Sequence, residues 1–254
     1  MFYNNYMIYG IIEVGGKSMN LDDMNKELNS YNSYADREVA VRKTMVGVYG
    51  WMAFALLISA MTGLYFASNI ELLYLLFSGP AYWAVVIGEI AIVVALSRRA
   101  YKMSSAAAKL WFVVYAILNG VTFGSAFAVY GLGVAGYAFL VTAIVFGIMT
   151  VYGYVTKTDL SSIGNLFVMA LIGMIVASLM NTFFIRSEGW TLAIMYISVI
   201  IFIGLIGYDT QKIKQLAYAE GNGVGNAKIL GALVLYLDFI NIFISLVNIM
   251  GKDN

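Results

Sequence analysis

Long apolar blocks alternate with short polar segments along most of this chain. Thr44–Ile70 is a charge-free run of 27 residues, and Leu160–Ile185 is another of 26. One helical crossing of a bilayer needs about 20 apolar residues. Leu110–Thr156 contains 47 charge-free residues, which is enough for two crossings, and it divides best at Tyr130–Gly133.

The blocks predict seven membrane-spanning helices. They lack the alternation of a membrane β-strand, and in lipid the backbone polar groups need partners within the segment. We therefore expect an all-α polytopic membrane protein, with residues 44–254 as its transmembrane domain and residues 1–43 as a polar cytosolic tail, helical near Ala35–Lys43. The expected spans lie near residues 45–67, 80–100, 109–130, 133–155, 161–185, 190–215 and 228–250.

Composition supports this class and excludes several chemistries. The chain is 61% hydrophobic and 11% charged, whereas a soluble domain is about 25% charged. It has no His and no Cys, which excludes disulfides, Cys/His zinc sites, thiol nucleophiles and imidazole-dependent triads. The net charge of +1 gives no indication of a nucleic-acid partner. The lipid bilayer is the expected partner, and no cofactor is expected.

The distribution of Lys and Arg predicts the orientation. In the seven-span topology, thirteen of the 15 basic residues fall on the side of the N-terminus, and only Arg186 and Lys252 fall on the other. Basic residues concentrate in cytoplasmic segments of membrane proteins. The N-terminus is therefore expected in the cytosol and the C-terminus outside.

Three carboxylates interrupt the predicted spans: Glu89, Asp209 and Asp238. Each costs about 2.5–3.5 kcal/mol at the bilayer centre, so such residues usually face the bundle interior and have a function. At about 1.5 Å per residue, all three lie roughly 10–15 Å from the cytosolic ends of their helices, so they could converge. For Glu89, an equally good interpretation is a solvated or neutral, hydrogen-bonded side chain.

The last span carries a polar stripe made of Asp238, Asn241, Ser245 and Asn248. At about 100° per residue these positions fall within a sector of about 80°. The stripe predicts a wet path or a polar bundle core, and a seventh helix surrounded by the other six.

Two segments also carry a family resemblance. Gly207–Ile213 (GYDTQKI) and Leu235–Phe243 (LYLDFINIF), supported by Arg42–Thr44 and Asn119–Gly124, resemble the signature segments of the Bax inhibitor-1 (transmembrane BAX inhibitor motif) family, whose bacterial members include YccA and YetJ. The similarity runs from about residue 35 to the end of the chain.

The resemblance implies a seven-helix fold with a central last helix and a pH-sensitive calcium leak channel in a bacterial inner membrane. Asp209 and Asp238 would share protons as the pH sensor. A second-helix arginine, Arg99 or its neighbour Arg98, would latch onto Asp209, and Glu89 could contribute to gating. Bacterial members are also linked to a membrane-bound AAA protease, so the alternative is a non-channel regulator that binds other membrane proteins.

Calcium is expected as the permeant ion. Asp209 and Asp238, with nearby amide and hydroxyl oxygens, offer a weak calcium contact but too few ligands for a tight site.

A shared proton is also used by aspartic proteases, and Tyr208-Asp209 fits the first half of an intramembrane protease site. The second half reads Tyr236-Leu237-Asp238 instead of Gly-x-Gly-Asp, so we do not expect an enzyme.

Overall fold

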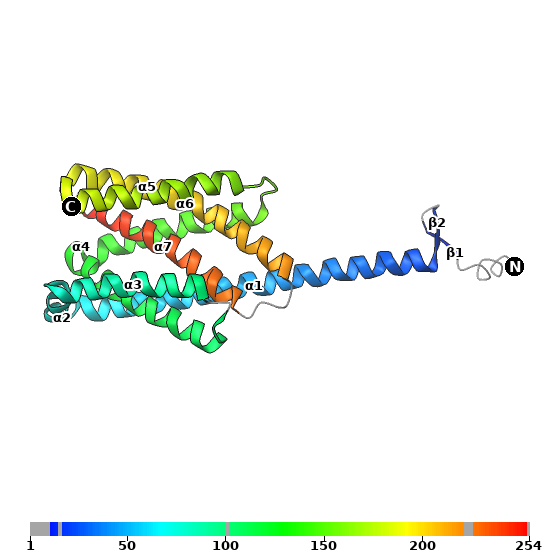
Figure 1. The fold of residues 1–254 in the computed structure, drawn as a ribbon, viewed down its shortest axis with the longest axis horizontal. Helices are drawn as coiled ribbons and strands as arrows, with labels where there is room; N and C mark the ends of the chain where they lie inside the picture. The colour runs from blue at the N-terminus through cyan, green and yellow to red at the C-terminus, as the bar shows by residue number, and fades with distance from the viewer. Residues whose placement is uncertain (1–10, 15–16, 100–101, 221–225, 253–254) are drawn as a thin grey trace.

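The structure is a computed structural model, and it describes residues 11–14, 17–99, 102–220 and 226–252. Helices gather into an elongated bundle, from which one long helix projects (Figure 1). The elements are β1 (Ile11–Val14), β2 (Lys17–Asn20), α1 (Leu21–Ala67), α2 (Ile70–Phe77), α3 (Pro80–Arg99), α4 (Ser105–Val155), α5 (Ser161–Met180), η2 (Asn181–Ile185), α6 (Glu188–Glu220) and α7 (Ala227–Gly251). β1 and β2 form an antiparallel pair. Neither this pair nor α2 was predicted from the sequence.

Among the residues that the structure describes, six helices are long and apolar enough to cross a membrane. The predicted spans near 109–130 and 133–155 both belong to α4, a single element of 51 residues. Its one non-helical residue is Gly131, with φ 79° and ψ 157°, a conformation that glycine adopts without strain. The chain reverses there, so both ends of α4 lie at the same end of the bundle (Figure 1). The expected division at Tyr130–Gly133 is therefore present, but the count of seven spanning helices is not confirmed.

The first helix begins earlier than the sequence indicates. α1 starts at Leu21, with Asp22 and Asp23 in its first turn, where acidic side chains favour a helix N-terminus. We call residues 21–36 the arm, because this part of α1 projects beyond the bundle (Figure 1), whereas Arg37 already lies over the Tyr218 ring of α6. The bundle end from which the arm leaves is the arm end, and the opposite end, where α7 finishes, is the C-terminal end.

α7 lies at the centre of the bundle. Its most apolar window is 67% buried, against 28% or less for the other spanning helices. Tyr236, Leu233, Leu235 and Ile242 of α7 are all fully buried. This agrees with the predicted position of the last span.

Glycines allow α4 to approach its neighbours closely. A Cβ added to Gly120 would lie 2.8 Å from the carbonyl oxygen of Ser59 in α1, and one at Gly153 would collide with the backbone of Gly207 in α6. Small residues permit such close helix contacts in membranes. The second contact fixes the position of α6 immediately before Asp209.

Candidate functional site

Asp209 and Asp238 come together at the α6–α7 interface. Their carboxyl groups lie within hydrogen-bonding reach of each other. Asp238 is 3% exposed, and its Oδ2 atom is buried without a hydrogen-bond partner among the described residues. A buried oxygen without a donor is costly, and a proton held between the two carboxyls would supply that donor.

The residues before Asp209 explain how α6 presents it. Gly207 packs against Gly153 of α4, and the ring of Tyr208 fills the space beside Gly164 of α5. Successive helix positions point about 100° apart. With positions 207 and 208 directed at α4 and α5, position 209 is turned toward α7.

A lysine is the cation that acts on Asp209. Lys212 follows Asp209 by three residues on α6, and its ammonium lies 5.3 Å from the centre of the Tyr208 ring. The sequence analysis missed this residue, although the spacing of three residues on one helix indicates such a neighbour.

The expected arginine latch is not formed in this structure. Arg98 and Arg99 are exposed at the end of α3. No ion pair of Arg98 or Arg99 occurs among the described side chains, and Lys26 and Asp23 form one in the arm, at 3.9 Å.

Glu89 belongs to a different polar cluster. It accepts a hydrogen bond of 3.1 Å from the Thr122 hydroxyl of α4. This matches the interpretation of a hydrogen-bonded side chain, whereas the suggested convergence with the aspartates is not seen.

Residues of the polar stripe of α7 contact two neighbouring helices, α6 and α4. The Ser245 hydroxyl lies 3.1 Å from the Ser198 hydroxyl of α6, while Asn248 Oδ1 accepts a hydrogen bond of 2.9 Å from Tyr130 of α4. Asn241 Nδ2 donates to the Leu237 carbonyl of its own helix. The stripe therefore faces the bundle core and not lipid, as expected.

Gln211, in the first signature segment, holds the α4–α5 connection against α6. Its Nε2 donates to the Thr158 carbonyl at 2.8 Å, and its Oε1 accepts from the Leu160 N–H at 2.9 Å. Lys214 Nζ donates to the Tyr154 carbonyl at 2.7 Å. These contacts tie the loop directly to the helix that carries Asp209, which the sequence analysis did not anticipate.

Three hydroxyls lie next to one another where α1, α4 and α6 meet: those of Tyr49, Thr150 and Thr210. Each is buried, and none makes a well-formed hydrogen bond within the described residues. Buried polar groups of this kind are usually completed by water or an ion. No group of three or more acidic, His or Cys side chains suited to a metal occurs among the described residues.

Comparison with known proteins identifies the chain's relatives. Residues 41–254 match the family described as "Inhibitor of apoptosis-promoting Bax1". Inner membrane protein YbhL of Escherichia coli K12 is 40% identical over 226 residues, covering 87% of this chain and 96% of YbhL. An uncharacterized protein of Deinococcus radiodurans is 40% identical over 211 residues, covering 82% and 90%. One of Rickettsia prowazekii is 34% identical over 233 residues, covering 91% and 98%.

Proposed function

The chain belongs to the Bax inhibitor-1 family of integral membrane proteins, as its motifs predict, and on this premise we propose that it is a pH-sensitive calcium leak channel. The observation that carries the proposal is the buried contact between Asp209 and Asp238 across the α6–α7 interface. We further propose that α4 crosses the membrane twice, giving seven crossings with the arm in the cytosol and the C-terminus outside.

The proposed pH sensor is the proton shared by this pair. Two close carboxylates in a low dielectric cannot both ionise cheaply, so their protons leave in two separate steps that belong to the pair. With one proton, the carboxyls can share a short hydrogen bond that ties α6 to α7. Losing that proton places two negative charges together, and gaining a second one alters the same bond. Either change loosens the contact between the central helix and its neighbour.

The proposed ion contact is weak. Calcium prefers oxygen ligands, and the pair offers carboxylate oxygens while Asn241 and Ser245 offer amide and hydroxyl oxygens further along α7. Conduction requires binding that is favourable enough to admit an ion and weak enough to release it. Such a path suits a leak better than ion storage.

A second candidate function rests on the arm. Tyr31 and Tyr34 are 70% and 61% exposed on a helix that leaves the bundle. Large exposed aromatic side chains are typical of binding surfaces. In this alternative the chain is a regulator that binds another membrane protein, such as a membrane-bound protease.

Ion flux through the purified protein separates the two functions. The full chain is reconstituted into liposomes that contain a calcium-sensitive dye, and calcium is added outside at several pH values. A channel gives a passive, pH-dependent signal that empty liposomes lack. Folded protein without any signal would contradict the leak channel and favour the regulator.

A further inference from the structure

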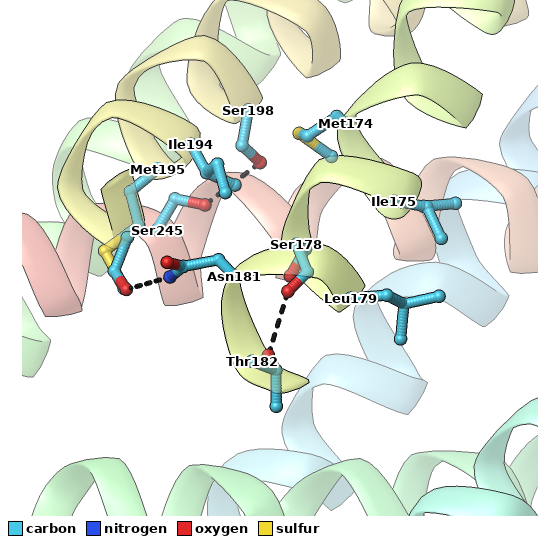
Figure 2. A pocket seen from close by; sticks show the side chains of 11 residues that line it. Met174, Ile175, Ser178, Leu179, Asn181, Thr182, Ile194, Met195, Ser198 and Ser245 are labelled. Atoms are coloured by element: carbon cyan, nitrogen blue, oxygen red, sulfur yellow. Dashed lines mark hydrogen bonds between the residues drawn. The ribbon is translucent and has the colours of Figure 1, made fainter. Parts of the chain in front are cut away.

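A cavity of about 330 Å³ lies at the C-terminal end of the bundle, between α5, η2 and α6, with α7 behind it (Figure 2). Neither Asp209 nor Asp238 lines it. About half of its lining side chains carry a hydroxyl or an amide, and none is charged. The polar lining residues are Ser178, Asn181, Thr182, Thr191, Ser198 and Ser245.

A wide turn of helix shapes the mouth of this cavity. Residues 181–185 form a π-helical turn, and Arg186 follows in the left-handed conformation with φ 52°. Asn181 fixes the turn, because its Oδ1 accepts from the Ser187 N–H at 3.0 Å and its Nδ2 donates to Thr191 Oγ1 at 2.8 Å. π-Helical turns within helices are frequent at functional sites.

The floor of the cavity is the hydroxyl pair of Ser198 and Ser245. These side chains are 6% and 7% exposed and lie 3.1 Å apart. Ser198 follows the start of α6 at Glu188 by ten residues, which is about 15 Å at the rise of an α-helix. The floor therefore lies about 15 Å below the start of α6, which is about half the thickness of a hydrocarbon layer of roughly 30 Å.

Apolar side chains separate this floor from the aspartate pair. Ser245 and Asp238 lie on the same helix, seven residues or about 10 Å apart. Between these levels the α6–α7 interface is filled by a cluster in which every side chain is at most 4% exposed: Ile201, Phe202, Leu205, Ile206 and Ile242. A packed apolar constriction blocks ions when it is dry.

We propose that this cavity is a water-filled vestibule that admits hydrated cations to the α6–α7 interface, with the apolar cluster as the closed barrier between the vestibule and the aspartate pair. This inference rests on the proposed function, because it supplies the second end of the same path. The lining oxygens are neutral acceptors, which suit a hard cation that keeps most of its water.

The natural absence of cysteine allows a clean test, because each single-cysteine variant of the full chain carries one thiol. Ser198→Cys and Ser178→Cys probe the vestibule. Two controls lie beside Ser198 on α6: Ile201→Cys, in the apolar cluster, and Ile200→Cys, which is 64% exposed on the outer surface of the bundle. Glu188→Cys and Ser30→Cys mark the C-terminal end and the arm end.

Each variant is treated with a membrane-impermeant methanethiosulfonate reagent, after its folding has been checked by gel filtration. A thiol reacts as the thiolate and needs contact with water, so both vestibule cysteines should react at least about tenfold faster than Ile200→Cys and Ile201→Cys. They should react from the same side of the membrane as Glu188→Cys and from the side opposite to Ser30→Cys. The ratio of the labelling rate with a cationic reagent to the rate with an anionic reagent should be higher for the vestibule cysteines than for Glu188→Cys.

Three outcomes decide the matter. Folded Ser198→Cys and Ser178→Cys that react no faster than Ile200→Cys would overturn the vestibule, since a groove filled by lipid tails gives that pattern. The vestibule is supported if both cysteines are labelled rapidly and the cationic reagent on Ser198→Cys then lowers the calcium flux several-fold. If the vestibule cysteines label rapidly but wild-type liposomes show no flux, the vestibule stands and the leak channel fails.

Discussion

The hydroxyl groups of Ser59 and Tyr236 lie 2.7 Å apart and join α1 to the central helix α7. Ser59 Oγ also lies within hydrogen-bonding distance of the Ala116 carbonyl of α4, at 2.7 Å. Both side chains are fully buried. One serine therefore connects three helices close to the second signature segment.

Ser59→Ala should destabilise the protein by about 1–3 kcal/mol, because it leaves the buried Tyr236 hydroxyl without its partner. Thermal unfolding in detergent measures the change. Ser59→Ala combined with Tyr236→Phe should be less destabilised than the sum of the single variants, because both polar groups are then gone. Strict additivity would mean that the hydroxyl contact contributes nothing.

The contact between Gly153 and Gly207 sets a second stability prediction. A methyl group at Gly153 would collide with the Gly207 backbone, so Gly153→Ala should cost about 1–3 kcal/mol through overpacking. Gly147→Ala is the matched control, because it lies on the same helix with open space around it. Equal unfolding temperatures for the two variants would contradict the close α4–α6 crossing.

The pH response of calcium flux should depend on the aspartate pair. Flux should vary between about pH 6 and 8 in the wild-type chain, and Asp209→Asn or Asp238→Asn should flatten the profile, because an amide cannot titrate. Fluorescence from liposomes at stepped pH values provides the measurement.

Asp159→Asn is the control for this profile. Hydrogen bonds from the side chain and backbone N–H of Ser161 hold the pKa of the Asp159 carboxyl below its usual value. Asp159 therefore stays ionised throughout this pH range, and its loss should leave the profile unchanged. A pH profile that survives in both pair variants would rule the pair out as the sensor.

Lys212 should set the pH at which the calcium-flux profile has its midpoint. Lys212 favours the ionised form of its neighbour Asp209, so Lys212→Gln should move the midpoint of the flux profile to higher pH.

Arg98→Ala and Arg99→Ala, separately and together, test whether an arginine latch forms in another state. We expect the double variant to increase leak at a pH where the wild type is closed. Unchanged leak in all three variants would refute the latch.

Topology can be tested at the end of the chain. The distribution of basic residues and the reversal of α4 at Gly131 lead us to expect a reporter fused after Asn254 to signal from outside the cytosol. A matched fusion at the N-terminus should signal from the cytosol. Both reporters on the same side would show an even number of crossings and contradict the two passes of α4.

The class of protein, most of the helix boundaries and the family could all be predicted from the amino-acid sequence. These properties depend on local composition, because a charge-free run of sufficient length must form a helix in lipid whatever surrounds it. The carboxylates within the spans and the stripe of α7 could be identified for the same reason. The arm is the exception: its polar residues carry no hydropathy signal, so the start of α1 at Leu21 was missed.

Which side chains contact one another became clear from the folded structure. Equal depth suggested that Glu89 joins the aspartates, yet the rotation of α3 directs it to Thr122. The basic residue near Asp209 is Lys212, three positions later on the same helix. The vestibule likewise depends on a π-helical turn and on the hydroxyl contact between Ser198 and Ser245. Hydropathy specifies how deep a residue lies in the membrane. Its neighbours depend on the rotation and register of the helices. Rotation and register are set by close contacts between segments distant in sequence, such as the contact between Gly153 and Gly207.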